Sequence, residues 1–187
     1  RRPTKDQVEA AMYLWNKHFH FNLNDEIQQG WASLADDSDK PEPMPLLIES
    51  VDEGSVVQVG LPLVSIQNTL PAYYWLTTWY ETVLLRAIWY PTTVATQSKS
   101  IQNVFYRIYK SCGVSDEKAE GGVITKLWDF GQRGVSSHES AGLGGSAHLI
   151  NFIGSDTFSG AIFAQNYYGD GKCNIHNIAF SIPASEH

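Results

Sequence analysis

The C-terminal part of the sequence reads VITKLWDFGQR (residues 123–133), LINFIGSD (149–156) and IAFSIPASEH (178–187), three apolar runs that each end in polar side chains. Two segments of helical length, 137–149 and 157–168, separate the runs. Strands that alternate with such segments are typical of βαβ units with a parallel sheet. In these units, and above all in (β/α) barrels, the loops at the carboxyl ends of the strands hold the chemistry. We therefore expect an active site where the three runs end.

The runs end in groups of different chemical character. The first closes with a carboxylate, an aromatic ring and a guanidinium, the second with a carboxylate, and the third with a carboxylate and an imidazole. In sequence order these are Asp129, Phe130, Arg133, Asp156, Glu186 and His187.

Length and composition fit a folded globular chain. The 187 residues suffice for at least one sizeable core, and the apolar content of 43% is ordinary. The formal charge of −7 argues against a nucleic-acid partner held by a broad basic surface. Local arginines can still bind a phosphorylated small molecule. The sequence contains no run of eighteen apolar residues and no leader, so we expect neither a membrane span nor a signal peptide.

The cysteines and histidines predict no metal site. Cys112 and Cys173 form neither a disulfide framework nor a C-x-x-C pair, which favours a reducing compartment, the cytoplasm. The histidines outside the terminal run show no metal-ligand spacing and are interpreted as surface or structural residues: His18, His20, His138, His148 and His176.

The first half of the chain predicts helices and antiparallel strands. The apolar spacing indicates helices over 4–20, with Thr4 as N-cap, and over 24–34. From residue 46 a period of two predicts antiparallel strands in LLIESV, SVVQV and LVSIQNT. A long helix is expected to start at Pro71 and another to cover 97–111. The segment 115–122 is expected to be an exposed connector, which divides the chain into domains 1–120 and 121–187.

Aromatic residues are dense in the helix after Pro71. Tyr74, Trp75 and Trp79 share faces there. Such a stripe can form a ligand platform, but it is more often core or a subunit interface, since Trp and Tyr are favoured in both.

Three stretches carry a resemblance to a known family. DFGQRGVSSHESAGLGGSAHLINFIGSDT (129–157), SIPASEH (181–187) and NTLPAYYWLTTWYETVLLRAIWYPTTVAT (68–96) resemble nicotinamide phosphoribosyltransferases, of the type II phosphoribosyltransferase superfamily. The likeness is dense over 61–157, returns at 181–187 and is faint over the first sixty residues. Enzymes of this family are much longer, and this chain starts without Met, so the resemblance implies a fragment with cut ends.

The resemblance implies a fold and an activity. The expected α/β fold is an N-terminal mixed region with antiparallel strands, followed by the first βαβαβ units of an incomplete TIM-like barrel. The implied enzyme is a pentosyltransferase of NAD salvage, which makes nicotinamide mononucleotide and pyrophosphate from nicotinamide and phosphoribosyl pyrophosphate. Mg²⁺, ATP as a stimulating co-substrate and a homodimer with sites at its interface are implied as well. The isolated fragment is expected to be inactive, and marginally stable or aggregating, because an opened barrel exposes strand edges.

The resemblance also assigns roles to the first two runs. Phe130 would stack on nicotinamide, although alone it reads as a barrel-core residue. Arg133 would hold phosphate oxygens with its planar fork, where the alternative is an ordinary surface arginine. Asp156 would accept a hydrogen bond from the carboxamide and repel the extra charge of nicotinate, and it also fits an ordinary helix N-cap.

The third run supplies the remaining roles. His187 matches the histidine that ATP phosphorylates in the family, a role suited to a neutral imidazole near pH 7. Glu186 would orient that ring or bind magnesium, and Ser181 would line the nicotinamide pocket. Two positions depart from the pattern, since Gln132 replaces an aromatic residue and Trp128 a polar one. Two other functions stay open, a nicotinate phosphoribosyltransferase and a non-catalytic barrel fragment that only binds a partner.

One pair of acids has a second interpretation. Asp36 and Asp37 resemble the paired acids that hold ribose in Rossmann-like phosphoribosyltransferases. Those acids follow a strand of branched apolar residues, whereas these follow a predicted helix, which favours a solvated loop.

Overall fold

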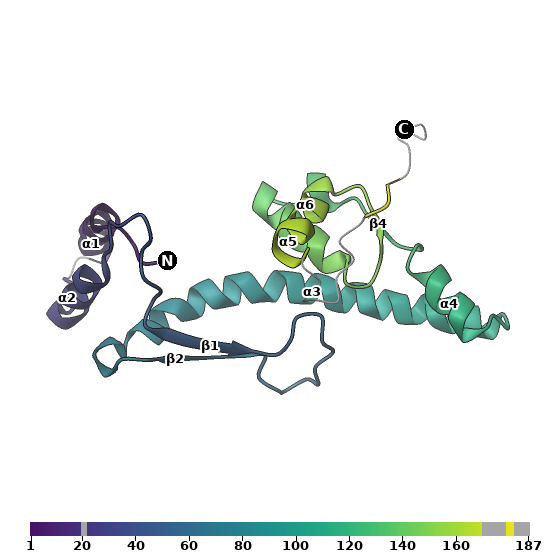
Figure 1. Ribbon diagram of the computed structural model, residues 1–187, viewed down its shortest axis with the longest axis horizontal. Helices are drawn as coiled ribbons and strands as arrows, with labels where there is room; N and C mark the ends of the chain where they lie inside the picture. Colours follow the sequence, from purple (N-terminus) through teal and green to yellow (C-terminus); the bar gives the residue numbers. More distant parts are fainter. Residues whose placement is uncertain (20–21, 170–178, 182–187) are drawn as a thin grey trace. The chain divides into compact units, whose positions relative to one another are not determined.

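The structure, a computed structural model, describes residues 1–19, 22–169 and 179–181 (Figure 1). The chain forms two compact units. The first contains Arg1–Val51 and Val59–Val83, and the second contains Asp52–Gln58 and the chain from Leu84 onward. The division between predicted domains at residue 120 stays a prediction, because compactness within this chain does not test where a barrel domain begins.

Two capped helices open the first unit. Helix α1 (Lys5–Phe19) begins with a reciprocal pair of bonds, in which the Gln7 N–H donates to Thr4 Oγ1 at 3.2 Å and the Thr4 N–H donates to Gln7 Oε1 at 3.0 Å. This is a capping box with glutamine as the second member. Helix α2 (Asp25–Leu34) is capped by the Asn24 side chain. Both predicted helices and both N-caps are confirmed.

An antiparallel hairpin follows the helices. Strand β1 (Leu46–Ser50) pairs with β2 (Val64–Asn68), with Ile48 opposite Ile66. The predicted strand at 55–59 is wrong, because this segment is a loop in which the Val56 and Val59 side chains are 82% and 99% exposed. Valine side chains gain no packing energy from an extended backbone where no neighbouring element covers them.

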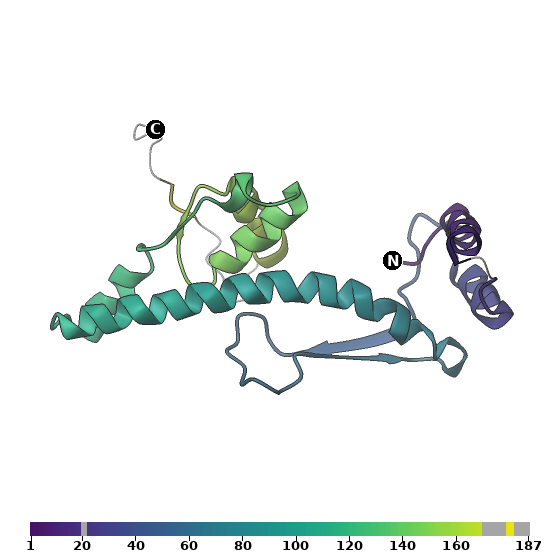
Figure 2. The same ribbon diagram turned by 180° about the vertical axis from the view of Figure 1, so that it is seen from behind.

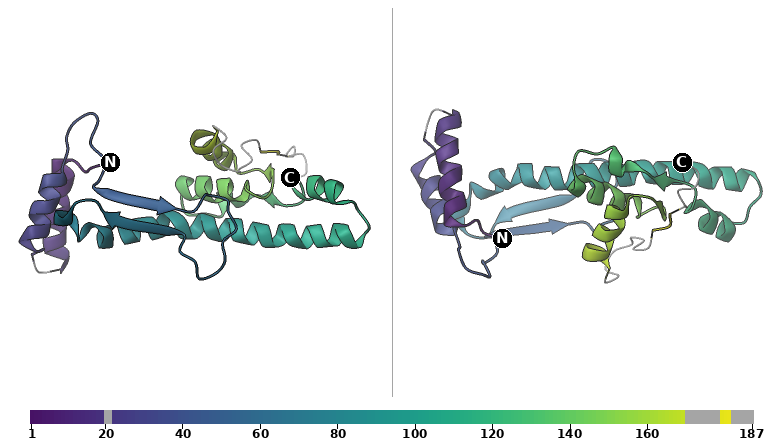
Figure 3. Two further views of the ribbon diagram at one scale, coloured as in Figure 1. Left: turned by 60° about the horizontal axis from the view of Figure 1, so that its bottom comes forward. Right: turned by 90° about the horizontal axis from the view of Figure 1, so that it is seen from above.

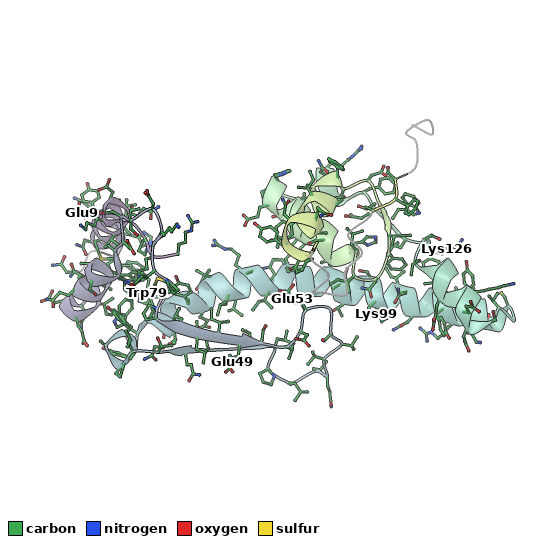
Figure 4. The ribbon with its side chains drawn as sticks, viewed as in Figure 1. Glu9, Glu49, Glu53, Trp79, Lys99 and Lys126 are labelled. Carbon is green, nitrogen blue, oxygen red and sulfur yellow. The ribbon has the colours of Figure 1, made fainter. Side chains whose placement is uncertain are left out.

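Aromatic side chains form the core of the first unit. Trp75 is 5% exposed and packs with Leu34 and Leu76, which are fully buried. The Trp31 ring lies 5.1 Å from that of Trp75 and 5.5 Å from that of Trp79, which Figure 4 shows in the first turns of α3. The core interpretation of the aromatic stripe is therefore confirmed for Trp75, which leaves little of its surface for a ligand.

Helix α3 (Leu76–Ser111) is a single element, preceded by the short 3-10 helix η1 (Pro71–Tyr73). The prediction of two separate helices is wrong, since Pro91 lies inside the continuous helix. An interior proline removes one hydrogen bond and costs about 3 kcal/mol, which packing can offset. The neighbouring turns are tied to the rest of the unit, because Asn151 Nδ2 donates to the Ala95 carbonyl at 3.0 Å.

Helix α4 (Asp116–Val123) forms in the segment that was predicted to be an exposed connector, and most of this segment is exposed. Its first residue is bound from α3, since the Asp116 carboxylate lies 2.7 Å from Lys110 Nζ and accepts a hydrogen bond from the Tyr106 hydroxyl at 2.6 Å. Ala119 and Val123 are buried on the inner face. Figure 2 shows α4 beside the last turns of α3. The amphipathic pattern of this helix is weak in the sequence, because its apolar residues are few and small and the others are mostly charged.

Helices α5 (His138–His148) and α6 (Phe158–Tyr168) pack directly on each other (Figure 3). The buried face of α5 consists of small residues, and a Cβ atom built on Gly145 would lie 2.7 Å from the Gly160 Cα atom. Both helices were predicted. The small side chains allow their backbones to touch.

Two short parallel strands alternate with these helices along the chain. Strand β3 (Trp128–Asp129) pairs with β4 (Gly154–Ser155), and Phe180 forms a parallel bridge with Gly154 on the other side. The predicted parallel arrangement of the three runs is confirmed at these residues. Among the described residues, no helix combines the length and apolar character needed to cross a membrane.

Candidate functional site

The ends of the three runs lie side by side. The Asp156 N–H donates to the Asp129 carbonyl at 2.9 Å, and the Ser155 N–H donates to the Phe180 carbonyl at 2.8 Å. Since the register pairs Asp129 with Ser155, Phe130 and Asp156 both lie one step beyond the paired residues. The structure thus brings Phe130, Asp156 and Ser181 to the same edge of the sheet.

A tight turn presents Phe130 and Arg133. The Asp129 carboxylate accepts a hydrogen bond from the Gly131 N–H at 2.8 Å, an Asx turn that starts the 3-10 helix η2 (Gly131–Arg133). A Cβ on Gly131 would lie only 2.8 Å from the same carboxylate oxygen, so a side chain there would displace the carboxylate from this hydrogen bond. Phe130 is 44% exposed among the described residues. Both interpretations of Phe130, as a stacking residue and as a barrel-core residue, stay predictions.

Arg133 ends the turn in an exposed position. Within the part of the chain that the structure describes, no carboxylate forms an ion pair with it. The N-terminus of α5 follows, where Ser137 Oγ accepts a hydrogen bond from the Ser140 N–H at 3.1 Å. Other N–H groups of the first turn are available to an anion. A guanidinium beside a helix N-terminus is an arrangement suited to phosphate.

Asp156 is half-buried and directly bonded to Ser181. The serine hydroxyl donates to Asp156 Oδ1 at 2.5 Å, the short distance of a charge-assisted bond. The helix that follows has Thr157 as its N-cap, so the interpretation of Asp156 as an ordinary N-cap is wrong. A carboxylate offers about four acceptor positions, and it can therefore bind a second donor while it keeps the serine.

Trp128 and Gln132, the two departures from the family pattern, have partners in the unit. The Trp128 indole covers Gly154, where a Cβ would lie 2.7 Å from a ring atom, and Nε1 donates to the Thr125 carbonyl at 3.1 Å. Gln132 Oε1 accepts a hydrogen bond from Ser159 Oγ at 3.4 Å. Trp128 and Gly154 thus form a matched pair that sequence reasoning missed, and the pairing of a large ring with a strand glycine was the available signal.

His148 is buried rather than part of the exposed edge. It is 5% exposed, its ring stacks on Phe152 with centroids 5.4 Å apart, and Nε2 lies 3.0 Å from the Gly154 carbonyl oxygen. Burial lowers its pKa below the ordinary 6.5, while the nearby Asp129 carboxylate acts in the opposite direction. The interpretation of this histidine as a satisfied structural residue fits these contacts.

The acids of the first unit support a structural role. Asp36 accepts hydrogen bonds from the N–H groups of Ser38 and Glu42, each at 3.0 Å, and Asp37 accepts one from the Lys5 N–H at 2.9 Å. Both carboxylates are thus engaged in holding the loop and the start of α1. These contacts favour the solvated-loop interpretation.

The remaining predicted residues, Glu186 and His187, lie outside the described residues. The described part of the chain holds no group of three His, Cys, Asp or Glu side chains that would bind a metal ion.

Known proteins resemble the chain over most of its length. Residues 125–187 match the model of the nicotinate phosphoribosyltransferase (NAPRTase) family. A nicotinamide phosphoribosyltransferase of Xanthomonas campestris pv. campestris is 38% identical over 160 residues, which cover 86% of this chain and 32% of the relative. That of Acinetobacter baylyi is 32% identical over 144 residues (77% and 27%), and that of Mycoplasma genitalium is 32% identical over 156 residues (82% and 33%).

The chain spans about a third of the length of the curated relatives that it matches. The matches extend beyond the motifs quoted above, since the first covers 86% of the chain. The resemblance read from the sequence is confirmed: this chain is similar to nicotinamide phosphoribosyltransferases, and its C-terminal part matches the phosphoribosyltransferase family model.

Proposed function

We propose that the whole protein is a nicotinamide phosphoribosyltransferase, a pentosyltransferase that makes nicotinamide mononucleotide and pyrophosphate from nicotinamide and phosphoribosyl pyrophosphate. The observation that supports this most is the identity of 38% over 160 residues with a relative of that name. The alternation of β3, α5, β4, α6 and Phe180 is compatible with a (β/α) barrel, and we propose that these elements begin a TIM-like barrel that the rest of the protein completes.

The exposed edge offers a place for the pyridine ring. We assign stacking on the ring to Phe130, which stands out from the Asx turn. A face-to-face contact orients the ring without using the lone pair of its nitrogen, which must attack the sugar carbon. That attack forms the C–N bond, and the C–O bond to pyrophosphate breaks with its electron pair leaving on the phosphate oxygen.

Asp156 selects the amide in this proposal. Its carboxylate, oriented by Ser181, accepts a hydrogen bond from the carboxamide NH₂ group. Nicotinate has no such donor and brings a second negative charge to the same place, at a cost on the order of several kcal/mol. In this proposal Ser181 lines the pocket and holds the Asp156 carboxylate, which recognises the carboxamide of the substrate.

Arg133 binds phosphate oxygens in this proposal, because its planar guanidinium can donate hydrogen bonds to two of them at once. Mg²⁺, when bound, neutralises pyrophosphate charge, and such ions are held largely by substrate phosphates with one or two carboxylates. The contribution of Glu186, the phosphorylation of His187 by ATP, a homodimer and a cytoplasmic location remain proposals that rest on the resemblance.

A nicotinate phosphoribosyltransferase is the second candidate, since the family model that matches residues 125–187 is described by that name. The two functions separate in a thermal shift experiment on the whole protein. We expect nicotinamide to raise the melting temperature, because a ligand at about 100 times its Kd stabilises the folded state by about 2.7 kcal/mol. A larger shift with nicotinate would transfer the assignment to the second candidate.

Asp156→Asn tests the selecting group. An amide side chain removes the like-charge repulsion, so we expect the preference for nicotinamide over nicotinate in kcat/KM to fall at least tenfold. Asp52→Asn, in the exposed loop after β1, is the matched control and should leave the preference unchanged. If Asp156→Asn keeps the wild-type preference, another group reads the carboxamide.

His187→Ala tests the terminal motif. We expect ATP stimulation to disappear while a slow ATP-independent transfer remains. Stimulation of wild-type size in this variant would remove His187 from the mechanism. If neither nicotinamide, nicotinate nor phosphoribosyl pyrophosphate binds the wild-type protein, the non-catalytic binding module is the better description.

A further inference from the structure

One buried titratable side chain has no role in the proposed reaction. His148 is the last residue of α5 and is 5% exposed. Its ring is fixed on one face by the parallel ring of Phe152, at an interplanar angle of 13°. A polar ring in such a place must find hydrogen-bond partners, because an unpaired buried polar group is costly.

The partners of His148 lie in the sheet that holds the site. Nε2 lies 3.0 Å from the Gly154 carbonyl oxygen, which belongs to β4, and the ring also interacts with the backbone of Leu127, the residue before β3. Gly154 is the residue that pairs with Trp128 in β3 and bridges to Phe180. The ring therefore contacts the backbone of both neighbouring runs. Its contact in the second run, Gly154, lies two residues before Asp156.

The protonation of the ring follows from its partners. A carbonyl oxygen can only accept, so the hydrogen bond to Gly154 requires a proton on Nε2. Burial, the largest influence on the pKa of His148, disfavours the imidazolium, whereas the Asp129 carboxylate and the backbone bonds to Gly154 and Leu127 favour it. The net effect is a pKa below the ordinary value. We therefore expect a neutral ring in its Nε2–H tautomer at neutral pH.

We infer that His148 is a positioning residue, whose Nε2–H bond to the Gly154 carbonyl, together with its contact to the Leu127 backbone, holds β4 against β3 and so keeps Asp156 opposite Phe130. The inference deepens the proposed function, since the purpose of the positioning is the binding of nicotinamide. An ordinary packing role would explain the stacking on Phe152, but it does not need a proton on a particular nitrogen.

Two variants separate hydrogen bonding from packing in the whole protein. His148→Phe keeps an aromatic ring but loses the donor, whereas the side chain of His148→Gln can still donate an N–H to a carbonyl. His18→Phe, an exposed position on α1, is the matched control. The first readout is amide hydrogen exchange at Asp156 and Ser155, whose N–H groups bond to Asp129 and Phe180. The second is the affinity for nicotinamide and, separately, for phosphoribosyl pyrophosphate.

We expect His148→Phe to speed exchange at both amides about tenfold or more and to weaken nicotinamide binding about tenfold, the effect of about 1.4 kcal/mol. His148→Gln should stay within about threefold of wild type in both readouts, as the change in one preserved hydrogen bond is small. Phosphoribosyl pyrophosphate affinity should not change. Unchanged exchange in His148→Phe, or equal defects in both variants, would overturn the inference.

A measurement on the wild-type protein keeps the test independent of folding and of the ligand. Nitrogen-15 NMR of the His148 ring at pH 7 should show a proton on Nε2, and a ring protonated on Nδ1 alone would overturn the inference. If the wild-type protein binds no nicotinamide, the proposed function fails, while the exchange and the tautomer still decide whether His148 joins the strands.

Discussion

Two glycines set how closely α5 and α6 approach. A Cβ on Gly145 would lie 2.7 Å from Gly160 Cα and 2.9 Å from Thr157 Cγ2, and a Cβ on Gly160 would lie 2.6 Å from Gly145 Cα. Backbone atoms cannot yield as a flexible side chain can. Because α6 starts directly after Thr157, this contact also fixes the position of the loop that holds Asp156.

We therefore expect Gly145→Ala to lower the free energy of unfolding by about 1–3 kcal/mol, the usual cost of overpacking. Gly121→Ala is the control, since a Cβ there meets nothing within 4 Å in helix α4. It should raise stability by up to about 1 kcal/mol, the difference in helix propensity. Urea denaturation of both variants checks the pair, and equal effects would show that the α5–α6 contact can relax.

At the scale of elements, the N-termini of helices α5 and α4 differ in their capping. Ser137 caps α5 through its side chain, with the Ser140 N–H at 3.1 Å from Oγ. Ser115 occupies the same N-cap position in α4 but makes no side-chain capping bond. Identical residues at equivalent positions thus make different hydrogen bonds.

Ser137→Ala is expected to lower the free energy of unfolding by about 1 kcal/mol, because one N–H of the first turn loses its acceptor. Ser115→Ala should change it by less than half of that. Chemical denaturation of the two variants under one set of conditions measures the difference. A loss of the same size at Ser115 would mean that the cap forms in solution at both helices.

At the scale of the whole molecule, groups with lowered pKa values link stability to pH, and His148 and Asp36 are two of them. His148 has a lowered pKa because of burial, so the unfolded chain takes up a proton first. Asp36 has a pKa lowered to about 2, chiefly by hydrogen bonds from Ser38 and also by the Glu42 N–H. Both groups stabilise the fold in their deprotonated form, and both contributions decline as the pH falls.

The sign and window follow from linkage. Stability should begin to fall as the pH drops below 6.5, the ordinary value for histidine, and continue to fall toward the lowered pKa of folded His148. A second loss, from Asp36, should occur between pH 3.8 and about 2. Denaturation at pH 7, 6 and 5 measures the first loss, which His148→Phe should abolish. If the stability of His148→Phe falls with pH as steeply as that of the wild-type protein, another group causes the loss.

Apolar side chains remain on the surface of the second unit. Trp89 is 59% exposed, Leu85 56% and Phe158 72%. Apolar surface of this kind commonly marks contact with another part of a protein. We expect the 187-residue chain in isolation to self-associate, which light scattering across a range of concentrations would show. A monodisperse monomer with cooperative melting would contradict this expectation.

The sequence by itself determined most of the helices and strands and the order in which the candidate site residues follow them. Period and capping residues located α1 and α2, the apolar runs located β3 and β4, and the helical length of the segments between the runs located α5 and α6. These signals depend on neighbours within a few residues. The polar residues that follow the runs were visible in the same way, as were the motifs shared with the phosphoribosyltransferases.

Tertiary structure decided what depends on partners far apart in the chain. Pro91 stayed inside α3 because packing outweighs its local cost, 116–123 became helical because α3 binds its first residue, and 55–59 stayed a loop because no strand covers it. The bonds from Ser181 to Asp156 and from His148 to Gly154 also join separate elements. Local sequence fixes backbone preference, whereas a hydrogen bond across the sheet exists only once folding has brought its two groups together.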